Sequence, residues 1–389
     1  MTGRIRLAHL TTVDLALVVL LGSELTAGRD AGHEVLGISA PGTWTPELQA
    51  LGVPHVAVPE LVRSWSPVQD LRAAIALWRL LPGLDLDVLH THTPKAGILG
   101  RVIGRLRGVP VVVNTCHGLW AVPGDHWVKR ALVYGAEGVA IRFSDAELFQ
   151  NSEDPITLRA FLRGRYWRTV GNGTDLNAFR FDADERNRVR AEWGVGPDDV
   201  LVGGVGRMVA EKGLGEFAQV ARRLGDRARF VWVGPIDDER AVFDHDTLEG
   251  VQLVGERRDM PAVYSAMDIF VLPSYREGFP RSAMEAAACG RTLVLTDIRG
   301  CREIGKRGVH AWFVPAGDPS ALGDAMGELL DSPELCRRLG DAAYRRAREN
   351  FDQQEVARRS FVAYRDAGRR KHLAWANELA MPSVGSPQE

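Results

Sequence analysis

The chain has 389 residues, which is too long for a single hydrophobic core and predicts two domains of ordinary size. Apolar residues make up 45% of it and charged residues 25%, which is the balance of a globular protein and excludes a disordered chain. The formal net charge of -2 argues against nucleic acid as the main partner, because binding to a phosphate backbone needs a surplus of basic side chains.

The cysteines and the N-terminal region indicate a cytoplasmic location. Four cysteines are scattered along the chain: Cys116, Cys289, Cys301 and Cys336. Because they form no Cys-x-x-Cys pair, we expect reduced thiols. Residues 5–10 are a strand-like run with no signal-peptide pattern before it, and the longest apolar stretch, 15–21, is far shorter than the roughly 20 residues of a membrane span. We therefore expect a cytoplasmic protein, for which any membrane contact would be peripheral, on the cytoplasmic face.

In the first half of the chain, short apolar runs alternate with helical patterns, which is typical of a parallel sheet covered by helices. The predicted strands are residues 5–10, 34–39, 55–58, 88–92, 111–115 and 146–150. Amphipathic helices are predicted at 68–81 and 96–106. Turn-forming residues at 170–175 then interrupt the pattern, so we place the end of the first domain at residue 172.

The alternation begins again in the second half, which we assign to a domain covering 173–352. The predicted strands are residues 200–205, 230–233, 251–253, 269–272 and 293–296, and the predicted helices are 320–330 and 333–350. A last amphipathic helix at 353–377 follows both sheets, and the tail 381–389 is predicted to be disordered. The predicted fold class is α/β, with two Rossmann-like domains facing a central cleft, because open parallel sheets bind ligands at the carboxyl ends of their strands.

A glycine-rich turn follows the strand at 200–205. Residues 203–213 read Gly-Gly-Val-Gly-Arg-Met-Val-Ala-Glu-Lys-Gly, and a helix is expected from about residue 214. Glycines let a ligand approach the backbone, and a helix N-terminus favours negative charge. Arg207 and Lys212 add two positive charges, and Lys212 is one of only five lysines in the chain. We therefore favour a diphosphate site over simple packing; it is not a Walker loop, because Gly213 follows the lysine.

The second informative segment, 272–290, contains two carboxylates. Glu277 lies in the loop after a predicted strand, and Glu285 lies among alanines in a helix that Pro280 starts and Gly290 ends. A vicinal diol such as a ribose could donate two hydrogen bonds to Glu285. A salt bridge between Glu285 and Arg281, one helical turn earlier, explains the residue equally well.

The segment 276–290, with Glu277 and Glu285 eight positions apart, resembles the Glu-x7-Glu motif of retaining GT-B glycosyltransferases of family 4. The similarity extends to Gly206-Arg207 with Lys212-Gly213. It also covers residues 172–175, 268–274 and 296–303 of the second half. In the first half, residues 90–97 and 114–118 resemble bacterial polysaccharide-type members. One departure is Pro280, which stands where many members have the last glycine of Gly-Phe-Gly.

The resemblance implies a role for each matching residue. Arg207 and Lys212 would neutralise the donor diphosphate, Glu277 would contact the transferred sugar, and Glu285 would bind the ribose. Backbone N–H groups of Gly278 and Phe279 would reach the sugar or phosphate. The implied catalytic residues are His117, which would reach the sugar from the N-terminal domain, Arg207, Lys212 and Glu277; the implied donor-binding residues are Gly206, Arg207, Lys212, Glu277, Gly278, Phe279 and Glu285. The last helix, about 353–380, would complete the N-terminal, acceptor-binding domain.

The implied activity is retaining transfer of a hexose or N-acetylhexosamine from a nucleoside-diphosphate donor, expected to be a UDP-sugar. The acceptor would be a polyprenyl-diphosphate-linked saccharide at the inner membrane face, or another hydroxyl compound. No metal and no cofactor beyond the nucleotide-sugar co-substrate is expected. Four alternatives stay open: an isomerase similar to UDP-N-acetylhexosamine 2-epimerases, a natural-product glycosyltransferase with a soluble acceptor, an inverting transferase with Asp14 as its base, and a binding protein without catalysis.

Three further patterns are open to a functional and a structural interpretation. Asp85-Leu86-Asp87 matches the Asp-x-Asp motif of metal-dependent transferases. Its place directly before a predicted strand favours a structural role in the connection between the preceding helix and that strand. His90 and His92 share one face of a strand, with no third histidine at a suggestive spacing, so we expect hydrogen-bonded histidines. A basic group could contact anionic lipid or form an ordinary solvated helix face. Its members are Arg101, Arg105, Arg107, Lys129 and Arg130.

Overall fold

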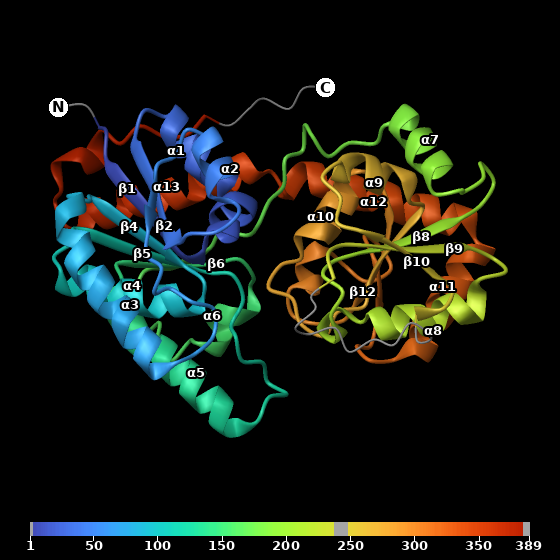
Figure 1. The fold of residues 1–389 in the computed structure, drawn as a ribbon, viewed down its shortest axis with the longest axis horizontal. Helices are drawn as coiled ribbons and strands as arrows, with labels where there is room; N and C mark the ends of the chain where they lie inside the picture. The colour runs from blue at the N-terminus through green and yellow to red at the C-terminus, as the bar shows by residue number, and fades with distance from the viewer. Residues whose placement is uncertain (1–2, 237–247, 384–389) are drawn as a thin grey trace. The chain divides into compact units, whose positions relative to one another are not determined.

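The computed structural model describes residues 3–236 and 248–383, and the chain divides into two compact units (Figure 1). The first unit takes Met1–Gly171 together with Gln353–Glu389, and the second takes Asn172–Asp352. Each unit has its own parallel sheet and its own hydrophobic cores. The predicted α/β class with two parallel-sheet domains is therefore confirmed.

The first unit is built on a seven-stranded sheet in the order β3-β2-β1-β4-β5-β6-β7, and its neighbouring strands are parallel. The strands are β1 Arg6–Val13, β2 Glu34–Ala40, β3 His55–Ala57, β4 Val88–His92, β5 Val111–Cys116, β6 Ala146–Phe149 and β7 Trp167–Thr169. Six of them were predicted, because a strand buried on both faces is a nearly continuous apolar run. The seventh, β7, was missed because its three residues are all exposed.

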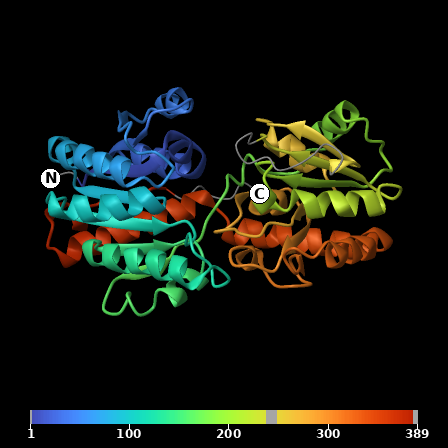
Figure 2. The same ribbon diagram turned by 60° about the horizontal axis from the view of Figure 1, so that its bottom comes forward.

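Helices cover both faces of this sheet (Figures 1 and 2). In one layer, α4 contacts both α3 and α5; on the other face, α1 contacts α13. The two cores take alternate residues of β1, so that Leu7 packs under α13 and Leu10 packs under α3 and α4. The helices are α1 Gly22–Asp30, α2 Thr45–Ala50, α3 Pro67–Leu80, α4 Pro94–Leu106, α5 Trp127–Ala140, α6 Glu153–Thr157 and α13 Gln353–Arg370.

The last helix is shorter than predicted. It ends at Arg370 and not at residue 377, because His372 adopts a left-handed backbone conformation with φ of 56° and a separate 3-10 turn follows at Ala374–Asn377. Phe361 and Tyr364 of α13 are fully buried in the core of the first unit. Among the described residues, no helix combines the length and the apolar character that crossing a membrane would require.

Met381, the first residue of the predicted disordered tail, and Ala380 before it are ordered against the first unit, so the prediction of disorder is wrong for Met381. The backbone N–H of Ala380 donates to the carbonyl oxygen of Gly3, and Met381 packs against the core beside α13. These contacts involve residues distant in sequence, so local composition could not reveal them. Residues 384–389 of the predicted tail lie outside the described residues.

The second unit is built on six parallel strands in the order β10-β9-β8-β11-β12-β13. The strands are β8 Leu201–Val205, β9 Arg229–Val233, β10 Val251–Gly255, β11 Ile269–Leu272, β12 Thr292–Thr296 and β13 Trp312–Val314. The helices are α7 Ala183–Glu192, α8 Leu214–Leu224, α9 Met260–Ala266, α10 Arg281–Ala288, α11 Pro319–Asp331 and α12 Pro333–Asn350. The three-residue β13 was not predicted.

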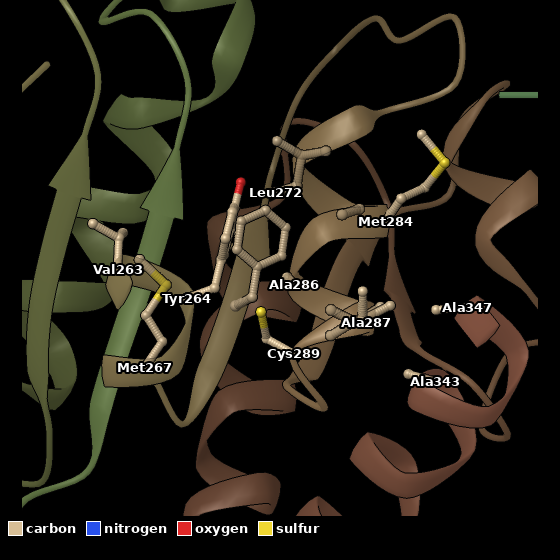
Figure 3. Close-up of a cluster of buried hydrophobic side chains, with 14 of the residues drawn as sticks. Val263, Tyr264, Met267, Leu272, Met284, Ala286, Ala287, Cys289, Ala343 and Ala347 are labelled. Atoms are coloured by element: carbon tan, nitrogen blue, oxygen red, sulfur yellow. The ribbon is translucent and has the colours of Figure 1, made fainter. Parts of the chain in front are cut away.

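Small residues allow helices α10 and α12 to pack closely (Figure 3). Ala286 and Ala287 of α10 and Ala343 and Ala347 of α12 are all buried in one core with Tyr264. The alanine run that surrounds Glu285 in the sequence is therefore explained by helix packing. As predicted, Gly290 follows the end of α10 with a positive φ of 72°.

Candidate active site

The carboxyl ends of β8, β11 and β12 bring three loops of the second unit to one edge of its sheet. These strands are parallel neighbours, so the loops that follow them leave the sheet on the same side. They are the glycine-rich turn after Val205, the Glu277 loop after Leu272, and the segment from Asp297 to Gly300 after Thr296. This edge is where an open parallel sheet binds ligands.

Lys212 and Glu277 form an ion pair at this edge. The Lys212 Nζ lies 2.7 Å from the Glu277 Oε1, although the two residues are 65 positions apart in sequence. Their side chains keep 23% and 11% of their surface exposed, respectively, so the pair is sheltered but still reachable. A lysine ammonium carries three N–H donors, and the carboxylate accepts one of them. The pair can therefore hold Lys212 in place and leave donors for an anionic ligand.

Gly213 makes the close approach of two loops possible. Its φ is 75°, and a Cβ at this position would lie 2.1 Å from the carbonyl oxygen of Pro273. The same two segments are joined by a hydrogen bond from the Tyr275 N–H to the Glu211 carbonyl, 2.9 Å long. The turn that carries Lys212 is thus fixed directly against the loop that carries Glu277.

The other glycines of the turn are required for different reasons. A Cβ at Gly203 would collide with Met267, and one at Gly204 would collide with the Trp232 ring, so both are needed for packing. Neither glycine was among the implied donor-binding residues, of which Gly206 is the one in this turn. The three atoms nearest to such a Cβ at Gly206 are side-chain carbons of Lys212, the nearest at 3.5 Å. The Gly206 backbone lies beneath the lysine stem, with the partly exposed Arg207 next to it.

The Glu277 loop is held from two sides. A Cβ at Gly300, where φ is 84°, would lie 2.7 Å from the carbonyl oxygens of both Glu277 and Gly278. The Asn172 Nδ2 donates to the carbonyl oxygen of Phe279 at 3.1 Å. The Phe279 ring itself is 9% exposed and lies edge-on to Phe351, so only the backbone of this residue is suited to contact a ligand. Neither Gly300 nor Asn172 was singled out individually from the sequence.

Glu285 has two partners. Its Oε1 accepts from Arg281 Nε at 3.1 Å, and its Oε2 accepts from the Tyr264 hydroxyl at 2.9 Å. Burial raises the pKa of Glu285, and the Arg281 charge and the Tyr264 hydrogen bond only partly offset this. The helical salt bridge with Arg281 is thus confirmed, whereas Tyr264 was not foreseen. Each carboxylate oxygen retains a second lone pair, so a diol could still donate to Glu285.

His117 lies in the first unit, where its half-buried ring is hydrogen-bonded to a chain of buried imidazoles. Its Nε2 is 2.9 Å from the His92 Nδ1, and the His92 Nε2 is 3.0 Å from the His9 Nδ1. Burial lowers the pKa of His117 to about 4 and that of His9 to about 3, so both rings are neutral near pH 7. His117 also lines a pocket of this unit together with Asn114 and Trp120.

His9 is the third histidine that spacing along the chain did not reveal. It comes from β1, opposite His90 of β4, and candidate ligand atoms of His9, His90 and His92 all lie within 4.8 Å of one another. His90 is hydrogen-bonded on both sides, at 2.6 Å from the Tyr364 hydroxyl and 2.7 Å from the Thr115 Oγ1. The prediction of hydrogen-bonded histidines is therefore confirmed; among the described residues these three also lie close enough together to hold a metal ion, although both ring nitrogens of His90 already have partners.

Asp14, the base of the inverting alternative, and Asp87 of the Asp-x-Asp pattern both accept hydrogen bonds from backbone N–H groups. The Asp14 Oδ2 accepts from the backbone N–H of Trp44 at 2.8 Å, and its Oδ1 accepts from that of Leu15 at 2.9 Å. The Asp87 Oδ2 accepts from the backbone N–H of Arg6 at 2.8 Å. These contacts give Asp14 and Asp87 structural roles, and they argue against Asp14 as a free general base.

The basic group of the first unit does not form a single surface patch. Arg101 is 1% exposed and pairs with Glu137 and Glu147 in the interior, and Arg105 pairs with Asp145. Ion pairs from α4 to α5 and to the β6 segment therefore account for these two arginines, and spacing in the sequence could not distinguish that arrangement from a lipid-facing surface.

Comparisons with known proteins identify the family. Residues 199–332 match the model of the glycosyl transferases group 1, and residues 21–153 match that of the glycosyl transferase 4-like domain. The D-inositol 3-phosphate glycosyltransferase of Xylanimonas cellulosilytica is 30% identical over 73% of this chain and 73% of its own length. The chain belongs to the family 4 glycosyltransferases. The enzyme is therefore a hexosyltransferase, as the motifs predicted, and the comparisons do not favour the epimerase-like alternative.

Two further similarities concern the substrate class and the fold. The UDP-Gal:alpha-D-GlcNAc-diphosphoundecaprenol alpha-1,3-galactosyltransferase of Escherichia coli is 28% identical to this glycosyltransferase over 72% of the chain and 75% of its own length. Anabaena HepE, solved in complex with UDP, superposes with a TM-score of 0.78, covering 92% of this chain and 98% of its own, at 18% identity. At that identity the superposition supports the GT-B fold only.

Proposed function

We propose that this glycosyltransferase moves a hexose or N-acetylhexosamine from a UDP-sugar to a lipid-linked saccharide, with retention at the anomeric carbon. The supporting relatives are the Escherichia coli enzyme, whose name gives a UDP-galactose donor and a diphosphoundecaprenol acceptor, and HepE with its bound UDP. The single observation that carries the proposal is the Lys212–Glu277 pair beside the Gly206 turn.

The proposed chemistry is electrostatic. As the bond from the sugar to the diphosphate breaks, negative charge builds up on the leaving phosphate oxygens. Lys212, held by Glu277, and Arg207, one residue beyond Gly206, would stabilise that charge. The proposal assigns no step to a metal or another cofactor, so it predicts transfer activity in the presence of a strong chelator.

The remaining site residues have proposed positioning roles. Glu285 would accept from the ribose hydroxyls, and the backbone of Gly278 and Phe279 would contact the sugar or phosphate. Retention would result when the leaving phosphate takes the proton of the acceptor hydroxyl on the same face of the sugar. His117, a neutral hydrogen-bonded imidazole, is the proposed catalytic residue of the first unit.

A product assay tests this function. The enzyme is incubated with UDP-sugars and a diphosphoundecaprenol-linked GlcNAc acceptor, and the new linkage is analysed by NMR. We expect an α-linked disaccharide from an α-linked donor, and no epimerised sugar when the donor is incubated alone. A β-linked product would contradict retention, and an epimer formed without acceptor would contradict transfer.

A further inference from the structure

Helix α3 of the first unit is apolar on two opposite sides, and the described residues of the chain cover only one of them. Ala73 and Leu77 are fully buried against the sheet. Four other apolar residues share the outer side at helical spacings of three, four and three positions, and all are exposed: Val68 (61%), Leu71 (61%), Ile75 (42%) and Trp78 (43%). An exposed row of large apolar side chains on a helix is typical of a binding surface.

The exposed surface continues past the start of α3. Trp65 is 50% exposed, and its ring centroid lies 5.8 Å from that of Trp120, which is 43% exposed and precedes α5. In α5, Trp127 is 70% exposed and Leu132 is 68% exposed. Helices α3 and α5 flank α4 in the same layer (Figure 1). We call the outer residues of α3 together with Trp65, Trp120, Trp127 and Leu132 the apolar face.

The charges around the apolar face are mainly positive. Arg72 and Arg79 are exposed on α3, and the Arg107 guanidinium carbon lies 4.7 Å from the centroid of the Trp78 ring. The single acid of α3, Asp70, is neutralised by Lys95, at 2.5 Å. At the other end, the Lys129 Nζ, which pairs with Asp125 at 2.9 Å, lies 5.2 Å from the centroid of the Trp120 ring. Exposed tryptophans beside arginine and lysine are the composition of helices that lie in the headgroup region of an anionic bilayer.

We infer that the apolar face docks on an anionic lipid bilayer, with Leu71, Ile75 and Trp78 entering the headgroup region and Arg72 and Arg79 contacting lipid phosphates. This inference rests on the proposed lipid-linked acceptor, which such docking would keep near the first unit. Of the basic group for which the sequence left a lipid contact open, Arg107 and Lys129 lie beside this face, whereas Arg101 is buried.

Vesicle co-sedimentation of the full chain tests the inference. Vesicles of phosphatidylglycerol with phosphatidylcholine are compared with vesicles of phosphatidylcholine alone. The wild type is expected to bind the anionic vesicles, and the double variant Leu71→Gln/Ile75→Gln is expected to bind at least about tenfold more weakly. The matched control is Val309→Gln, which changes an apolar residue 47% exposed in the second unit and is expected to bind as the wild type does.

The outcomes separate docking from its alternatives. Failure of the wild type to bind anionic vesicles, or wild-type binding by the double variant, would overturn the inference. Sedimentation velocity is run in parallel, and a dimer of the wild type that dissociates in the double variant would assign the face to a second copy. Transfer to a detergent-dispersed acceptor reports on the proposed function alone, and the double variant should retain it.

Discussion

The two units share a parallel sheet with helices on both faces, but they place their polar groups differently. The second unit collects charged groups on loops at the carboxyl edge of its sheet, where Lys212 and Glu277 pair and stay partly exposed. The first unit keeps uncharged imidazoles of His9 and His92 in its interior, with the half-buried His117 next to them, and apolar residues on its outer helices. The loops, and not the shared sheet, therefore decide which unit can stabilise a developing negative charge.

The largest effect is expected when the positive charge of Lys212 is removed from the second unit. Lys212→Met should lower kcat by about 10²–10³-fold, because a preorganised cation at the leaving group contributes about that much. Lys306→Met is the control, since Lys306 is an exposed lysine of the same unit. Thermal melting checks that both variants fold, and transfer rates are measured at saturating UDP-sugar. Near-normal turnover of the Lys212 variant would contradict the proposed role of Lys212 in stabilising the leaving diphosphate.

The next prediction tests whether the turn that carries Lys212 must contact the loop that carries Glu277. Gly213→Ala should destabilise the second unit by about 3 kcal/mol, because it combines an unfavourable φ with a collision against the Pro273 carbonyl. Gly308→Ala has a similar φ of 70°, but nothing lies within 4 Å of the added Cβ, so about 1 kcal/mol is expected. Urea unfolding measures both. Equal losses would show that backbone strain alone, and not the contact between loops, makes Gly213 necessary.

These glycines show how far sequence patterns lead. The alternation of apolar runs predicted every strand of four or more residues, and the motifs predicted the loops that carry Lys212 and Glu277 and the helix that carries Glu285. It could not predict that Gly203 and Gly204 make room for Met267 and Trp232, because those contacts join distant segments. For the same reason, the sequence did not reveal Tyr264 as a partner of Glu285, or His9 as a neighbour of His92.

The first unit should respond to acid before the second. Burial lowers the pKa of His9 to about 3 and that of His117 to about 4, from 6.5. The unfolded chain therefore binds more protons below pH 6.5, and stability should fall as the pH falls from 6.5 towards 4. Each histidine contributes a slope of about 1.4 kcal/mol per pH unit.

Urea unfolding between pH 7.5 and 5 measures this difference between the units, when the hydrogen exchange of backbone amides in β4 and in β11 is used to monitor each unit separately. His9→Phe should reduce the slope for the first unit, whereas His126→Asn, at an exposed position, should leave it unchanged. A slope equal in both units, or one unaltered by His9→Phe, would mean that the buried imidazoles are not the source of the pH dependence.

The smallest expected effect concerns the Tyr264–Glu285 hydrogen bond of the second unit. Tyr264→Phe should raise KM for the UDP-sugar about fivefold with little change in kcat, because a hydrogen bond to the carboxylate contributes about 1 kcal/mol and its loss raises the pKa of Glu285 further. The acid limb of the kcat/KM profile should shift to higher pH. Tyr344→Phe on α12, where Tyr344 is 41% exposed, is the control. A fall in kcat with KM unchanged would instead place Glu285 in the chemical step. Glu285 would then act on the leaving group together with the Lys212–Glu277 pair.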